Sequence, residues 1–157
     1  MSVVNLAYTT TAAITITLTN LTNAGVREST AVVNSANLYL DAIVGLQLAI
    51  SNGTVAGDKV AFVYFYGSVD GVNYTDNATG TDAALTMRSP TNLRGPFPCA
   101  MPANGPLTYY YTIGSVAQYF GGVLPTKWGV VVQNTSGVVF ATTGMSIFYA
   151  GITETVV

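Results

Sequence analysis

Residues 59–75, KVAFVYFYGSVDGVNYT, are the densest run of aromatic and β-branched residues in the chain. Successive side chains of an extended strand point to opposite faces, and both faces of this strand are apolar. One face consists of Val60, Phe62, Tyr64 and Tyr66, and the other of Ala61, Val63 and Phe65. A strand that is apolar on both faces is expected in the middle of a β-sandwich or at a subunit contact. The Asp70-Gly71 pair then predicts a tight turn, because glycine adopts positive φ and aspartate tolerates the turn.

The same period of two recurs on both sides of this strand. Apolar residues alternate with threonines in 9–22, which predicts a half-buried strand. Apolar residues fall on even positions in 37–51, which predicts another strand, with Gly45 expected to mark a bulge. Further strands are expected at 28–34, 85–88, 107–113, 127–133, 138–142 and 145–157, and one helical turn at 116–121. Roughly eight or nine short strands with turns between them predict a single all-β domain over 1–157, a two-sheet antiparallel β-sandwich of jelly-roll type.

Two segments lack a period of their own. Residues 1–8 are apolar but irregular, and we expect an N-terminal arm there. Residues 89–106 hold five of the six prolines, which predicts a long proline-rich loop because proline removes the donors of a strand ladder. Structureless segments of this length tend to be functional or to lie against a partner. We therefore expect both segments to contact other proteins.

The composition indicates that much of the surface is covered by partners. Half of the residues are hydrophobic and only 8% are charged, against a usual charged share of about 25%. The chain contains no stretch of about 18 uninterrupted apolar residues, so no membrane helix is predicted. The start of the chain does not have the pattern of a signal peptide. The five basic residues are scattered, so nucleic-acid binding is not expected.

The residues offer little for catalysis. The chain has no histidine, and its one cysteine, Cys99, has no basic neighbour in PFPCAMP to lower its pKa. Asp70, Asp76 and Asp82 lie six residues apart and could supply oxygen ligands to calcium, but their spacing matches no calcium-loop template and aspartate is a common turn residue. We predict no enzyme activity, no cofactor and no metal site.

Aromatic residues and the two irregular segments supply the candidate interface. Tyrosine is enriched at interfaces because it buries a large area and keeps a polar tip. Trp128 is interpreted as a core or interface anchor, or alternatively as a platform for sugar. The predicted interface residues are Val3, Val4, Leu6, Tyr8, Tyr64, Tyr66, Pro96, Phe97, Tyr109, Tyr110, Tyr111 and Trp128.

Two segments, GSVDGVNYTD at 67–76 with ATGT at 78–81, and FGGVLPTKWGVVVQNTSG at 120–137, resemble the decoration, or cement, proteins of tailed bacteriophages. The resemblance covers roughly half of the chain in pattern. It implies a β-sandwich, commonly a trimer, that clamps neighbouring subunits of the major capsid protein from outside. It also implies synthesis in the cytoplasm of a bacterial host, location on the capsid surface of the virion, and no catalytic residue.

Two other functions are compatible with the same fold. One is a carbohydrate-binding or receptor-binding module of a phage tail, in which Trp128 or the tyrosines would stack on sugar. The other is an enzyme, such as an accessory domain of a glycosidase. A sugar-binding module should expose aromatic residues in a groove, whereas a decoration protein should bury them between chains.

Overall fold

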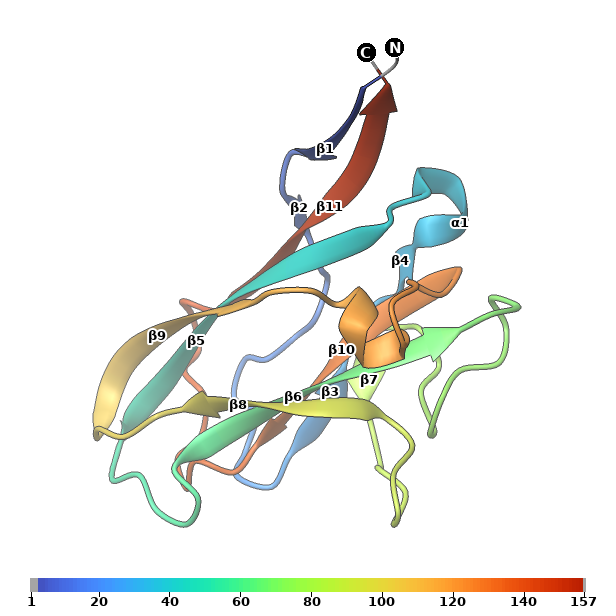
Figure 1. Cartoon of the computed structure of the whole chain (residues 1–157). Coiled ribbons are helices and arrows are strands. Elements are labelled where there is room, and N and C mark those ends of the chain that lie inside the picture. The colour runs from blue at the N-terminus through green and yellow to red at the C-terminus, as the bar shows by residue number, and fades with distance from the viewer. Residues whose placement is uncertain (1–2, 157) are drawn as a thin grey trace.

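The computed structural model describes residues 3–156, which form two antiparallel β-sheets packed face to face (Figure 1). The first sheet has the order β1 (Val4–Tyr8), β11 (Ser146–Val156), β5 (Asp41–Gly53) and β9 (Gly105–Ile113), with β2 (Ala12–Ala13) also paired to β11. The second sheet has the order β7 (Ala83–Ala84), β3 (Val26–Glu28), β10 (Lys127–Asn134), β6 (Val60–Ser68) and β8 (Arg94–Ala100), with β4 (Val32–Val33) also paired to β10. The helical elements are α1 (Asn34–Asn37) and the 3₁₀ turn η1 (Ala117–Phe120).

The order of the strands is that of a jelly roll. Strands β1 and β2 follow one another along β11, and β3 and β4 follow one another along β10. The chain then changes sheet at every step between strands except from β6 through β7 to β8. With 46% strand and 5% helix, the structure confirms the predicted antiparallel β-sandwich. The helical turn expected at 116–121 is confirmed as η1.

The core lies between the sheets, and the strand that opened the sequence analysis lies in its centre. Strand β6 pairs with β10 on one side and β8 on the other, and Val63 and Phe65 on its inner face are fully buried. Trp128 of β10 is also fully buried, with its ring centroid 5.6 Å from that of Tyr149 in the opposite sheet. Strand β5 contributes alternate residues to the same core, namely Val44, Leu46, Leu48 and Ile50.

Gly45 does not mark a bulge. The ladders of β5 with β9 and with β11 run through it without a shift, and the irregularity in β5 falls between Ile50 and Gly53. Glycine is needed at this position for another reason: a Cβ would lie 2.4 Å from Cε2 of Phe148. The ring of Phe148 therefore covers the backbone of β5, and the missing side chain is what admits it.

Three predicted strands are wrong in extent. In 9–22 only β2 pairs, although Ile14 and Leu18 are buried as the alternation requires. The segment instead crosses from one sheet toward the other: the Ile14 amide donates to Ile147, and the Thr15 carbonyl accepts from the Thr30 amide. Residues 138–142 form only an isolated bridge, between Phe140 and Ile50. No strand lies at 85–88, because the nearby strand β7 ends at Ala84.

The two irregular segments are also strands in part. Residues 4–8 of the predicted arm form β1, which pairs with β11, and residues 1–2 lie outside the described part of the chain. The predicted loop at 89–106 contains β8 and the start of β9. Strand β8 is an edge strand, with a partner only in β6, so Pro96 and Pro98 can occupy it without losing a ladder on the second side.

The two sheets differ in what covers their outer faces. The long connection between β6 and β8 lies over the second sheet, where Leu85 and Leu93 pack against Tyr66 and Val131 in a small second core. The outer face of the first sheet has no comparable cluster within residues 3–156. This difference decides which surface remains open to a partner.

Candidate interaction surfaces

Large apolar side chains lie exposed along the outer face of the first sheet. Residues that pair across a ladder point to the same side, so Tyr8 shares a face with Ile152, and Phe148 shares that face through alternation along β11. Tyr110 of β9 lies on the same face. It pairs with Gln47, and Gln47 points to the same side as Gly45, two residues away, which pairs with Phe148. We call this set the outer apolar face. Its most exposed members are Val4 (57%), Leu6 (68%), Tyr8 (67%), Tyr110 (74%) and Phe148 (41%).

The outer apolar face is large for a protein of this size. A large aromatic side chain presents roughly 150–250 Å², so these five residues together expose on the order of 600 Å². The largest apolar patch on a typical monomer is roughly 300–600 Å², and a specific interface buries about 800 Å² per partner. The face therefore approaches the area of an interface.

Part of this face lies on a two-stranded ribbon. Strand β1 and residues 152–156 of β11 extend beyond the rest of the sandwich, with the start of β1 and the end of β11 at the tip (Figure 1). The apolar side also carries the exposed carboxylate of Glu154, which pairs with Leu6 across the ladder. On the opposite side, the hydroxyl groups of Thr153 and Thr155 donate to the carbonyl groups of Ala7 and Asn5. A two-stranded ribbon is marginally stable in water without a hydrophobic cover. The apolar side of the ribbon is thus suited to contact another surface.

The structure brings only some of the predicted interface residues together. Val4, Leu6, Tyr8 and Tyr110 belong to the outer apolar face, and Val3 is exposed at its end. Pro96 and Phe97 lie on β8 in the other sheet. Phe148 was missed, although Phe148, Ala150 and Ile152 alternate with the inward-facing residues of β11 and could have indicated that both faces are apolar.

Two predicted interface residues are wrong, because the chain itself buries them. Tyr66 is fully buried under the β6–β8 connection, and its hydroxyl donates to the carbonyl of Ser29 at 2.6 Å. Trp128 is fully buried between the sheets, so it serves as a core anchor and offers no platform for sugar. Tyr64 is half-buried beside Tyr66 on the outer side of β6, and its hydroxyl donates to Gln133.

The tyrosine run is divided between the two faces of β9, as predicted. Tyr110 points outward, whereas Tyr109 and Tyr111 stack on each other with ring centroids 6.5 Å apart and pack against the core. Their hydroxyl groups donate to the carbonyl groups of Ala103 and Ala100. These two tyrosines join β9 to the end of β8, and only Tyr110 is available to a partner.

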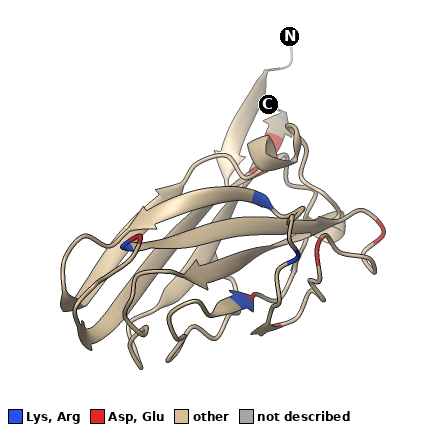
Figure 2. Cartoon of the chain, turned by 90° about the horizontal axis from the view of Figure 1, so that it is seen from below, with Lys and Arg blue, Asp and Glu red and all other residues tan. Residues whose placement is uncertain are grey.

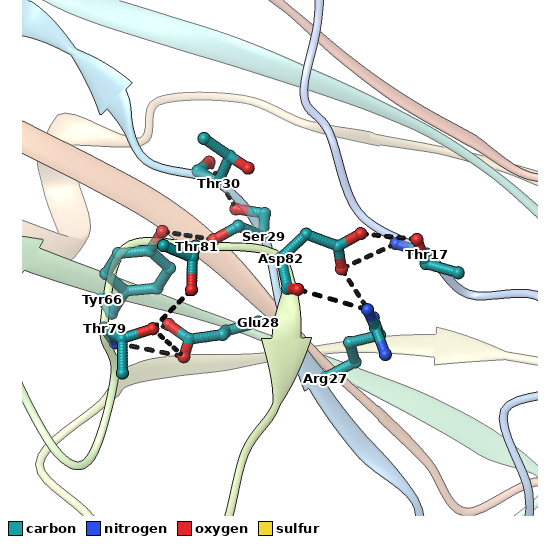
Figure 3. A network of polar contacts seen from close by, with 9 residues as sticks. All are labelled: Thr17, Arg27, Glu28, Ser29, Thr30, Tyr66, Thr79, Thr81 and Asp82. Atoms are coloured by element: carbon teal, nitrogen blue, oxygen red, sulfur yellow. Dashed lines mark hydrogen bonds and ion pairs between the residues drawn. The ribbon is translucent and has the colours of Figure 1, made fainter.

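Carboxylates hold the connection that covers the second sheet. Glu28 is buried and accepts hydrogen bonds from the amide and hydroxyl of Thr79 and from the amide of Gly80. Asp82 accepts from Arg27 Nε at 2.6 Å and from Thr17, beside the bond from Tyr66 to Ser29 (Figure 3). Both carboxylates are thus occupied in fixing 79–82 to β3.

The three aspartates that were weighed as calcium ligands have separate partners. Asp70 accepts from Ser68, Val72 and Asn73 within its own turn. Asp76 accepts from Thr91 and from the amide of Arg88, and Asp82 from the residues named above. Among residues 3–156, no group of three or more acidic, histidine or cysteine side chains is placed to hold a metal ion.

A groove of about 760 Å³ lies at one end of the second sheet, between the turn after β6, the start of β8 and the segment before β10. The groove is lined by Ser68, Asp70, Tyr74, Arg94, Phe120 and Pro125, among others. Hydrogen bonds from Asn73 hold the pKa of Asp70 well below its usual range, so this carboxylate is ionised. The turn is also fixed from outside, because the Thr126 hydroxyl donates to Ser68 and Val69 and the Lys127 ammonium donates to Gly71.

The one cysteine of the chain is buried. Burial raises the pKa of the Cys99 thiol to about 12, so it stays protonated at neutral pH. Charged residues are few and dispersed over separate strands and loops (Figure 2). None of the helices in the described part of the chain is both long and apolar enough to span a membrane. Comparison with protein-family models, with curated proteins and with solved structures finds no match for this chain.

Proposed function

We propose that this protein is a virion structural protein that decorates the capsid of a tailed bacteriophage and stabilises the head through apolar contacts. The observation that carries the proposal is the outer apolar face, an open sheet face with Leu6, Tyr8 and Tyr110 about two-thirds or more exposed. The resemblance of 67–76 and 120–137 to decoration proteins supports the same role. The fold alone would not support this role, because jelly rolls also form lectins and other domains.

The energetics favour assembly through this face. About 600 Å² of apolar surface at about 25 cal/mol per Å² corresponds to a gross gain of roughly 15 kcal/mol when it is covered, from which the cost of association must be subtracted. The other sheet offers no equivalent surface, because Leu85 and Leu93 already cover it. With only 8% charged residues, the chain has few groups that would oppose contact between copies.

The proposed partners are other copies of the chain, as a homotrimer, and the major capsid protein. In this arrangement the broad part of the face around Phe148 and Tyr110 joins the copies, and the ribbon with Leu6 and Tyr8 reaches the capsid. The ribbon suits the second role because it projects from the sandwich and its apolar side is open (Figure 1). The proposed location is the outer surface of the virion, after synthesis in the cytoplasm of the host.

Binding to capsids tests the proposal. Heads assembled from the major capsid protein of a tailed bacteriophage would be mixed with the purified protein and sedimented. We expect the unchanged protein to sediment with the heads, and the double variant L6S/Y8S to lose binding at least tenfold. V72S is the matched control, because Val72 is 76% exposed on a turn away from the ribbon. Absence of binding by the unchanged protein, or equal binding by L6S/Y8S, would overturn the proposal.

A further inference from the structure

We infer that the groove between the turn after β6 and the segment before β10 binds an acidic saccharide, with the carboxylate of the sugar paired to Arg94. This site is separate from the outer apolar face, because its walls belong to the second sheet and its loops. Its volume of about 760 Å³ falls within the range of roughly 300–1,000 Å³ that is usual for small-molecule sites.

The walls combine apolar rings with polar groups, which is the combination that a sugar ring requires. Phe120 and Tyr74 are half-buried lining residues. The Tyr74 ring packs edge-on against Tyr66 and lies over Gly80, so Phe120 is the ring offered to the C–H groups of a sugar. Phe120 is held in place from behind, since a Cβ on Gly67 would lie 2.8 Å from its Cε1. The rim carries the side chains of Asn73 and Asn92, whose amides match sugar hydroxyl groups.

The charges of the groove select the ligand further. Arg94 is the one cation among the lining residues, and its guanidinium makes no hydrogen bond or ion pair within residues 3–156. A guanidinium pairs best with a planar carboxylate, through two parallel hydrogen bonds. Asp70, in the turn after β6 that forms another wall, is ionised. Its Oδ1 already accepts three hydrogen bonds and its Oδ2 one, so Oδ2 can accept from a hydroxyl group of the ligand, but the carboxylate repels a second anionic group. A ligand with one carboxylate and several hydroxyl groups fits both walls, whereas a chain of phosphates needs more cations than the groove has.

The groove is also preorganised for binding. The turn that forms one wall is fixed by the bonds to Asp70, by the hydroxyl of Thr126 and by the ammonium of Lys127, which lies outside the lining. Rigid walls reduce the ordering cost of binding, which matters for a ligand as polar as a sugar.

The test is isothermal titration of the full chain with uronate trisaccharides, namely those of galacturonate, glucuronate and mannuronate, and with the neutral hexose trisaccharides of the same linkage. We expect at least one uronate to bind with a Kd of about 1 mM or tighter, and its neutral counterpart to bind at least tenfold more weakly. Variant R94Q, which keeps hydrogen-bonding groups and removes the charge, should lose at least tenfold. K59Q is the matched control, because Lys59 is an exposed cation outside the groove.

A second variant tests the aromatic wall. G67A should displace Phe120 and weaken the uronate, and its thermal unfolding would be measured to verify that it folds; if it does not fold, F120A replaces it. The inference is overturned if no uronate binds at 10 mM (about tenfold above the expected Kd), if neutral trisaccharides bind equally, or if R94Q binds as well as the unchanged protein. It is also overturned if inorganic phosphate competes at the same concentration, since the groove would then be a general anion site.

Discussion

Glu28 should be the acidic residue on which the folded state depends most strongly. Glu28 is 1% exposed, and its carboxylate accepts from the Thr79 amide and the Thr79 hydroxyl, both at 2.9 Å (Figure 3). It also accepts from the Gly80 amide at 3.2 Å. The substitution E28Q keeps the size of the side chain, but it removes the charge and turns an NH₂ group toward at least one of these donors. Hydrogen bonds to charged groups contribute about 1.5–3 kcal/mol each, and a buried donor without a partner costs a further 1–3 kcal/mol or so. We therefore expect the free energy of unfolding to fall by about 3–5 kcal/mol.

Urea unfolding followed by tryptophan fluorescence measures this loss, because Trp128 is the only tryptophan and is fully buried. With a urea m-value of about 2 kcal/mol per M, the midpoint should fall by about 1.5–2.5 M. E154Q is the matched control, since Glu154 is exposed on the ribbon, and it should change stability by less than about 0.5 kcal/mol. A loss below about 1 kcal/mol in E28Q would refute the reasoning, because the three hydrogen bonds would then contribute little.

Three further predictions concern packing, pH and the thiol. G45A should lose about 1–3 kcal/mol in thermal or urea unfolding, because its Cβ would lie 2.4 Å from Phe148; stability equal to the unchanged protein would show that the ring moves freely. For Asp82, desolvation raises the pKa, but hydrogen bonds from Arg27 and Thr17 outweigh it and the net pKa is lowered. Its stabilisation is therefore complete above the ordinary aspartate pKa of about 4 and is lost as the pH falls through the lower folded value, so D82N should show a smaller loss of stability between pH 6 and pH 2 than the unchanged protein. Cys99 should not react with iodoacetamide at pH 8 until the chain is unfolded, because its pKa is raised to about 12; rapid alkylation of the native protein would contradict its burial.

The sequence predicted the strands whose residues alternate and also pair. Strands β5 and β11 combine a period of two with a long ladder, and β6 and β10 are runs of β-branched and aromatic residues that also form long ladders, so pattern and structure agree. Alternation reports burial alone, and this is why 9–22 was predicted as a strand: Ile14 and Leu18 are buried, but most of the segment crosses between sheets. The prolines of 89–106 exclude a central strand, and a loop was predicted there, but part of the segment forms the edge strand β8, which tolerates proline.

The candidate surfaces were predicted less well, for a physical reason. A strand with two apolar faces must pack against apolar groups on both sides. Its sequence does not say whether the cover on the second side comes from the same chain or from another. For Tyr66 the cover is the chain's own connection, with Leu85 and Leu93. For Leu6 and Tyr8 no such cover exists within residues 3–156, and both are exposed. The groove was not predicted, because Arg94, Phe120 and Tyr74 come from three segments that only the fold brings together.

The mass of the protein in solution tests the central proposal most directly. Light scattering on the chromatographed protein at micromolar concentration should give three times the chain mass of 16.3 kDa, and the variant F148S/Y110S should give the mass of a single chain with an unchanged circular dichroism spectrum. The outer apolar face would then be the contact between copies. A monodisperse single chain for the unchanged protein, or an oligomer that survives F148S/Y110S, would contradict the proposal that this face assembles the protein.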